Sequence, residues 1–159
     1  MPRYPGTLII AAVGKLRTPH WQSAQAEYVS RLKRYVQVDV REVRDVVGGS
    51  ISEEVAMARE GETLLKSVGT TPWVLALDPA GRQADSVRFA HYLRQQLGIY
   101  HELAFVIGGP SGLAPKVLEQ ANERFSLSSL TFPHELARVV LLEQLYRGMT
   151  ILSGEPYHK

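Results

Sequence analysis

The sequence predicts a single α/β domain in which a mostly parallel sheet is flanked by helices. Apolar runs of strand length alternate with helical patterns along the whole chain, which is typical of parallel sheets covered by helices. The 159 residues, 45% hydrophobic and 21% charged, have the size and balance of one compact domain. No low-complexity linker or internal repeat divides them. We therefore expect residues 1–159 to form one domain.

The first two strands and the helix between them follow from local patterns. Residues 7–13 are an apolar run of strand length. Thr18 suits an N-cap and Pro19 the first helical position, which predicts a helix to about Arg34. Residues 36–41 alternate Val with polar side chains, a period of two that predicts a strand with one solvent-facing side. This second strand is expected near an edge of the sheet.

The middle of the chain predicts a further helix and a buried strand. Ser50 and Glu53 have the spacing of a capping box and precede a helical pattern that continues to about Val68. Residues 73–77 are continuously apolar, as in a strand buried on both faces, and Asp78 ends the run.

The next pair of elements leads into a glycine-rich loop. A helix is expected over about 85–97, ended by Gly98. Residues 103–107 form a second fully apolar strand that continues into Gly-Gly-Pro-Ser-Gly at 108–112.

The last third predicts a short helix, a final strand and a long helix. The short helix covers about 115–122, and residues 125–131 are predicted as the last strand. Pro133 then begins a helix to about Leu152, which leaves 153–159 as a C-terminal tail.

Three loops compete for a ligand, because open α/β sheets bind ligands beyond the carboxyl ends of their strands. They follow Leu77, Ile107 and the segment 125–130. The loop 108–112 lacks the spacing of a dinucleotide fingerprint and the Lys of a phosphate loop. Its glycines let backbone groups approach a flat ligand closely. An ordinary strand-to-helix turn is the more usual meaning of these residues, because Gly and Pro are common in turns.

Several function classes have no support in the sequence. The five His residues lack metal-site spacing, Cys is absent, and there is no nucleophile elbow, so neither a metal nor covalent acyl chemistry is expected. No signal peptide or apolar run of about 20 residues is present, which predicts a cytoplasmic protein without a membrane span. A net charge of +2 permits an anionic partner without requiring one. Basic residues between 31 and 44 could contact RNA, but a solvated face is their more usual meaning.

The final helix carries two further predictions. It is apolar on nearly every side, and one small sheet covers only one side, so a second subunit is expected to cover the other in a homodimer. His134 and Arg138 lie four residues apart and share a helical face. An imidazole and a fixed cation beside a ligand loop could remove a proton and stabilise an anion. A capping His and a solvated Arg are an equally good account of the spacing.

Five ordered blocks resemble one known family, and the similarity extends over essentially the whole chain. The blocks are LDPAGR at 77–82, FVIGGPSG at 105–112, SLSSLTFPH at 126–134, RVVLLEQLYR at 138–147 and the terminal PYHK. The family is the SPOUT-class enzymes that methylate N3 of a pseudouridine in large-subunit (23S) ribosomal RNA.

The resemblance implies an α/β knot, with a trefoil-knotted, mostly parallel sheet, and a homodimer. It implies S-adenosylmethionine as the cofactor and large-subunit ribosomal RNA, within the ribosome, as the substrate. The residues implied to bind the cofactor are Leu77, Gly108, Leu127, Ser128, Ser129, Leu130, Thr131 and Phe132.

The expected chemistry assigns His134 and Arg138 to the reacting nitrogen, with Tyr157 and His158 of the tail closing over the base. Which His accepts the proton stays open. A noncatalytic RNA-binding or ribosome-assembly module with a nucleotide-like pocket is the alternative. An enzyme with a nicotinamide cofactor is a weaker one, because the glycine spacing is absent.

Overall fold

The structure, a computed structural model, describes residues 1–46 and 48–159. Its strands form one five-stranded sheet in the order β2-β1-β4-β3-β5, and every neighbouring pair is parallel. The elements in chain order are β1 (Thr7–Val13), α1 (Pro19–Leu32), β2 (Gln37–Val43), α2 (Glu53–Val68), β3 (Trp73–Arg82), α3 (Ser86–Tyr100), β4 (Glu102–Ile107), α4 (Pro115–Gln120), β5 (Glu123–Phe125) and α5 (His134–Leu152). The predicted α/β class is confirmed.

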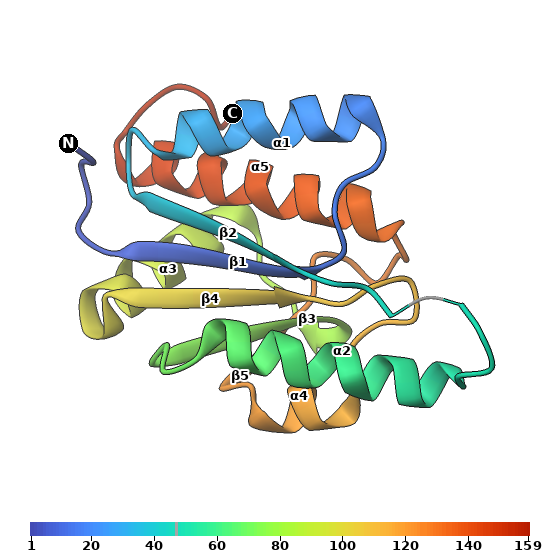
Figure 1. The fold of residues 1–159 in the computed structure, drawn as a ribbon. Helices are drawn as coiled ribbons and strands as arrows, with labels where there is room; N and C mark the ends of the chain where they lie inside the picture. The colour runs from blue at the N-terminus through green and yellow to red at the C-terminus, as the bar shows by residue number, and fades with distance from the viewer. Residues whose placement is uncertain (47) are drawn as a thin grey trace.

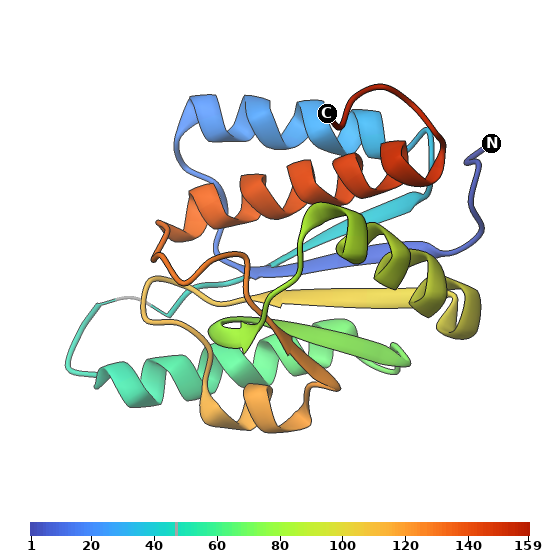
Figure 2. The same cartoon turned by 180° about the vertical axis from the view of Figure 1, so that it is seen from behind.

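The helices cover both faces of the sheet (Figures 1 and 2). Helices α1, α3 and α5 pack on one face, and α2 and α4 on the other. Strand β4 supplies both cores: Leu103, Phe105 and Ile107 face the first set, while Ala104 and Val106 face the second. Burial on both faces explains why residues 103–107 of this strand are all apolar. Strand β2 lies at the sheet edge, as its alternating pattern predicts.

Two helix ends differ from the sequence prediction. The N-cap of α2 is Ser52, not Ser50, and its side chain accepts a hydrogen bond of 3.3 Å from the Val55 N–H. Helix α3 continues through Gly98 and ends at Tyr100, and its C-cap residue His101 has a φ of 63°. A glycine inside a helix costs only about 1 kcal/mol relative to Ala, which packing of the helix offsets.

The start of α3 gives a simple stability test. The Asp85 side chain accepts a 2.8 Å hydrogen bond from the Arg88 N–H, so it satisfies one of the free donors of the first turn. Asp85→Ala should lower the free energy of unfolding by about 1 kcal/mol, whereas Asp85→Asn keeps the acceptor and should lower it far less. Urea denaturation compares the two, and equal stability of both variants would contradict the cap.

The segment 126–133 is not the strand that its composition predicts. Strand β5 ends at Phe125, and the following residues form a loop. The Ser126 hydroxyl donates to the Ser128 carbonyl at 2.9 Å, and the Ser128 hydroxyl accepts from the Leu130 N–H at 3.0 Å. Such local side chain–backbone bonds compete with a sheet ladder. The loop that results leads from β5 to α5 along the carboxyl edge of the sheet.

Helix α5 lies against the sheet between α1 and α3 (Figures 1 and 2). The prediction of a second subunit assumed that, within one chain, only the sheet could cover α5. That assumption was wrong, because α1 and α3 of the same chain cover both flanks of the helix. One stripe stays partly exposed, and it includes Leu136, Val140, Glu143, Arg147 and Ile151. The homodimer itself stays a prediction.

Over the residues that the structure describes, no helix combines the length and the apolar character needed to cross a membrane.

Candidate active site

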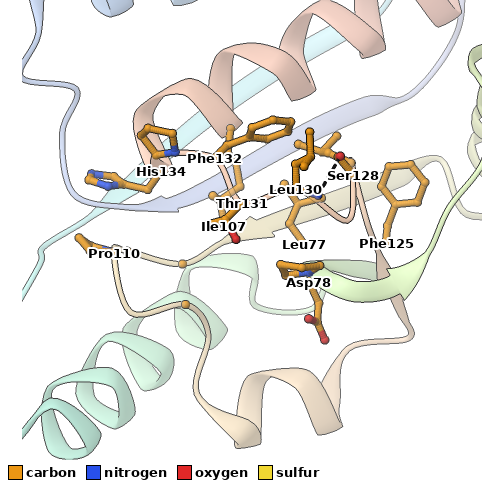
Figure 3. Close-up of a pocket in the computed structure, with 17 residues that line it drawn as sticks. Leu77, Asp78, Ile107, Pro110, Phe125, Ser128, Leu130, Thr131, Phe132 and His134 are labelled. Carbon is orange, nitrogen blue, oxygen red and sulfur yellow. Dashed lines mark hydrogen bonds between the residues drawn. The ribbon is translucent and has the colours of Figure 1, made fainter.

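A cavity of about 530 Å³ opens where three segments meet at the carboxyl edge of the sheet (Figure 3). One side is formed by residues 77–79 of β3, which does not end at Asp78 as predicted but continues through an irregular stretch to Arg82. The loops after β4 and β5 form the other sides, and the start of α5 closes the cavity. The cavity is lined by Leu77, Asp78, Pro79, Ile107, Gly108, Gly109, Pro110, Gly112, Phe125, Leu127, Ser128, Leu130, Thr131, Phe132, Pro133, His134 and Ala137. The three segments singled out in the sequence thus form one pocket, although the first of them belongs to β3 and is not a loop.

The predicted cofactor residues are brought together with one exception. Leu77, Gly108 and the segments 127–128 and 130–132 all line the cavity. Ser129 is exposed and does not line it. Its neighbour Ser128 turns the loop through its hydroxyl contacts, and this leaves the Ser129 side chain on the outer surface.

Sequence reasoning missed two kinds of pocket residue. Asp78 is the one carboxylate among the lining residues, and its Oδ1 accepts a 3.0 Å bond from the Ala80 N–H. Its place directly after the apolar run 73–77 was an available signal. Ile107 and Phe125 form apolar walls, and they looked like ordinary core residues because both also belong to the buried cluster.

The glycine loop requires its first glycine. A Cβ on Gly108 would lie 2.5 Å from both the carbonyl carbon and the oxygen of Gly112. The Gly112 N–H donates to the Gly109 carbonyl at 3.0 Å, and the φ of Gly112 is +86°. The loop is therefore folded tightly on itself, and its bare backbone forms a wall of the cavity.

The chemistry of the lining favours a ligand that has a flat ring and no phosphates. Neither Lys nor Arg is among the lining residues, so the cavity offers nothing to neutralise a row of phosphates. Apolar side chains face exposed backbone groups instead, an arrangement suited to a purine ring and a ribose. No group of three or more potential metal-ligating side chains occurs in residues 1–46 and 48–159.

His134 stands at the rim of the pocket as the first residue of α5 (Figure 3). The neighbouring Glu135 fixes this end of the helix: its carboxylate accepts from the Arg17 N–H at 2.6 Å and from the Thr18 hydroxyl at 2.7 Å. These bonds, that from Arg17 first, lower the pKa of Glu135. The pinned helix start fixes the position of His134 at the rim of the cavity.

Arg138 does not point into this pocket. Its side chain is only 2% exposed and lies under α1, where the guanidinium donates to Glu42 at 2.5 Å and to the Gly14 carbonyl at 2.8 Å. Arg138 lies one turn after His134, but there α5 packs beside α1 and against the ends of β1 and β2. Arg138 therefore joins α5 to the ends of β1 and β2.

This geometry predicts a structural effect of the partner carboxylate. Glu42→Ala would leave the buried Arg138 guanidinium without its counter-charge and should lower the free energy of unfolding by about 3 kcal/mol. The matched control is Glu27→Ala, which removes an exposed pair with Arg31 and should cost about 0.5 kcal/mol or less. Chemical denaturation measures both variants. Similar losses for both would contradict a buried clamp.

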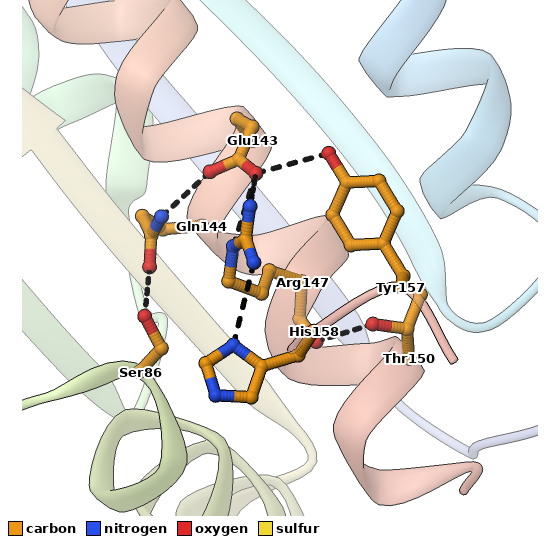
Figure 4. A network of polar contacts seen from close by, with 7 residues as sticks. All are labelled: Ser86, Glu143, Gln144, Arg147, Thr150, Tyr157 and His158. Atoms are coloured by element: carbon orange, nitrogen blue, oxygen red, sulfur yellow. Dashed lines mark hydrogen bonds and ion pairs between the residues drawn. The ribbon is translucent and has the colours of Figure 1, made fainter. Parts of the chain in front are cut away.

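The C-terminal tail is docked on α5 (Figure 4). The Tyr157 hydroxyl donates to Glu143 at 3.0 Å, and the same carboxylate oxygen accepts from Arg147 at 2.8 Å. Nδ1 of His158 lies 3.3 Å from Nη1 of Arg147, and the Tyr157 ring packs edge-on against Tyr146. These contacts hold a segment that would otherwise fray.

The docked tail lies away from the pocket of its own chain. Tyr157 and His158 do not line the cavity. Tyr157 contacts Glu143, which is about 13 Å along the helix axis from His134 at 1.5 Å per residue. Burial and the bond to Glu143 raise the pKa of Tyr157 to about 12. At neutral pH this phenol is a hydrogen-bond donor and not a base.

The basic run on α1 and β2 is partly neutralised within the chain. Arg31 pairs with Glu27 at 2.7 Å, and Arg41 pairs with Asp39 at 2.8 Å. Pairing within the chain is typical of charged residues on a solvated surface, and it adds no further support for RNA contact there.

A parallel α/β sheet with a glycine-walled pocket at its carboxyl edge defines a class of proteins that bind nucleotide-like ligands. A family model described as "Predicted SPOUT methyltransferase" matches residues 7–158. A relative from Gemmatimonas aurantiaca, named ribosomal RNA large subunit methyltransferase H, is 43% identical over 150 residues, covering 94% of this chain and 97% of the relative. The chain belongs to the SPOUT methyltransferase family, and within it to the group of ribosomal RNA large subunit methyltransferase H.

Solved structures of low sequence identity share the fold. A probable methylase family protein from Haemophilus influenzae matches with a TM-score of 0.57 at 13% identity, covering 96% of this chain and 70% of its own. A putative methyltransferase from Legionella pneumophila, solved with bound SAM, matches with a TM-score of 0.51 at 14% identity, covering 89% and 66%.

Proposed function

We propose that this chain transfers a methyl group from S-adenosylmethionine to N3 of a pseudouridine in large-subunit ribosomal RNA. The observation that carries this proposal is the cavity formed by residues 77–79 of β3 and the loops after β4 and β5. The names of the 40% to 45% identical relatives support the RNA substrate, and the resemblance of the five sequence blocks supports the pseudouridine.

The residues present fit this cofactor. The bare backbone at Gly108, where a Cβ would collide with Gly112, lets peptide groups come close to an adenine or ribose. Apolar walls such as Leu77 and Phe132 suit the purine, and the Asp78 carboxylate suits a ribose hydroxyl or an ammonium group. When bound, the cofactor supplies an electrophilic methyl group on a sulfonium.

The protein's own contribution is positioning and proton handling. The N3–H of a uracil-type ring is a weak acid, so a modest base beside it generates the nucleophile. His134 at the pocket rim is the candidate closest to the proposed cofactor site. Arg138 is proposed as a positioning residue that holds the start of α5, since its guanidinium bonds Glu42 and Gly14.

The tail completes the proposed site from a second subunit. In its own chain Tyr157 is docked beside Glu143, too far along α5 to reach the pocket. A homodimer built on the partly exposed stripe of α5 would present the tail of one subunit to the pocket of the other. Sedimentation is expected to show a dimer at micromolar concentration, and a monomer there would contradict it.

Calorimetry with S-adenosylmethionine tests the first step. We expect one binding event per chain or per dimer, and no binding of NAD. The second step is to map N3-methyl marks in ribosomal RNA from a strain that lacks this protein, where we expect one mark to be lost. An unchanged set of marks, or the absence of cofactor binding, would favour a noncatalytic RNA-binding module.

A further inference from the structure

A second cavity, of about 480 Å³, adjoins the cofactor pocket. His134 and Pro110 line both cavities and form the wall between them. The remaining walls come from the loop after β1, the loop after β2 and the first two turns of α2. A group held here lies next to the pocket, as the acceptor of a transferred methyl group must.

The second cavity is acidic, which restricts its ligand. Asp45, Glu53, Glu60 and Glu135 line it, against the cations Lys15 and Arg17. Arg17 is already paired with Asp45 at 3.2 Å. A phosphate would therefore meet an excess of negative charge, whereas a neutral ring that carries N–H donors would find acceptors.

Glu60 is the acceptor placed deepest in this cavity. It lies on α2 and is 9% exposed. Its Oε2 accepts a 3.1 Å bond from the Val46 N–H, which fixes the carboxylate. Its Oε1 lies beside the glycine loop, 3.9 Å from where a Cβ of Gly109 would be. Gly109 in turn lines the cofactor pocket, so this carboxylate stands directly behind the cofactor wall.

We infer that the second cavity holds the target ring and that the Glu60 carboxylate accepts a hydrogen bond from N1–H of pseudouridine. This inference rests on the proposed function. Uridine is attached to ribose through N1 and carries a C–H at the matching ring position, so it offers Glu60 no donor. In pseudouridine N1–H and N3–H lie on either side of the same C2 carbonyl. N1–H can therefore face Glu60 on α2 while N3 faces the cofactor pocket. Glu60 is thus a specificity-determining residue and not a catalytic one.

The effect of Glu60→Gln follows from its fixed geometry. The amide oxygen can accept the hydrogen bond from the Val46 N–H, and this turns the amide NH₂ toward the ring. The NH₂ and the ring N1–H are both donors, so they cannot form a hydrogen bond. A site built to bind an N–H rejects a ring without it by several orders of magnitude. We therefore expect the wild type to prefer pseudouridine over uridine by at least about 100-fold in kcat/KM, and Glu60→Gln to reduce this preference to below about 10-fold.

The test measures methyl transfer to two ribosome preparations, one with pseudouridine and one with uridine at the target position. Glu62→Gln, an exposed change on the same helix outside the cavity, is the matched control and should keep the wild-type preference. Calorimetric S-adenosylmethionine affinity should be unchanged in both variants, because Glu60 does not line the cofactor pocket.

Each outcome is decisive. A preference that survives in Glu60→Gln overturns the assignment of Glu60. If the wild type methylates both ribosome preparations equally well, the assignment of Glu60 is wrong, and this result does not depend on whether the variant folds. The proposed methyltransferase function survives that outcome. Methylation of neither ribosome overturns the proposed function and this inference with it.

Discussion

Deletion of residues 157–159 is expected to lower kcat/KM for methyl transfer by about 100- to 10,000-fold, because a general acid or base typically contributes a rate factor of that size. The tail carries a phenol and an imidazole that contact Glu143 and Arg147. It lies outside the cavity and contributes nothing to its walls. The affinity for S-adenosylmethionine and the fold should therefore stay close to those of the full chain.

Single substitutions separate the two tail residues. Tyr157→Phe keeps the packing against Tyr146 and removes only the bond to Glu143. His158→Ala removes the contact with Arg147. If His158 handles the proton, its variant should approach the deletion in kcat/KM, while the Phe variant should lose less. Deleting Lys159 alone is the control. Wild-type turnover by the chain without 157–159 would refute a role for the tail.

Gly108→Ala is expected to weaken binding of S-adenosylmethionine by at least about 100-fold, equivalent to about 2.7 kcal/mol. The new Cβ would lie 2.5 Å from two backbone atoms of Gly112, and backbone cannot rotate aside as a side chain can. The turn between Gly109 and Gly112 must open, which moves one wall of the pocket. Calorimetric titration measures the loss.

Gly98→Ala is the matched control for this change. Gly98 lies inside α3, where a Cβ would meet nothing within 4 Å. It should leave the cofactor affinity unchanged and raise the free energy of unfolding by about 0.5–1 kcal/mol, because Ala favours the helix. Cofactor binding by Gly108→Ala equal to that of Gly98→Ala would show that the loop is not a wall of the site.

The cofactor loops could be predicted because their positions depend on local patterns. Continuous apolar runs fix β3 and β4 as buried strands, and the ends of parallel strands meet at one edge. Asp78 and Ile107 were missed for a related reason. A residue at the end of a buried strand has one side in the core and one in the pocket, and composition alone does not separate these two roles.

Other features depended on partners distant in the sequence. Arg138 and His134 share a helical face, yet Arg138 bonds Glu42, almost a hundred residues earlier, because α5 passes under the ends of β1 and β2. The all-apolar character of α5 was visible, but that α1 and α3 cover its flanks was not. The depth of Glu60 likewise follows from the packing of α2 beside the glycine loop.

The α/β class, the alternation of strand and helix, and the three segments that meet at the site follow from the amino-acid pattern alone, since hydrophobic period and turn residues act over short range. Which polar side chains face the cavities, and which are held by ion pairs inside the protein, depends on the packed fold. A charged side chain lies where its counter-charge is, and the fold alone brings that partner close.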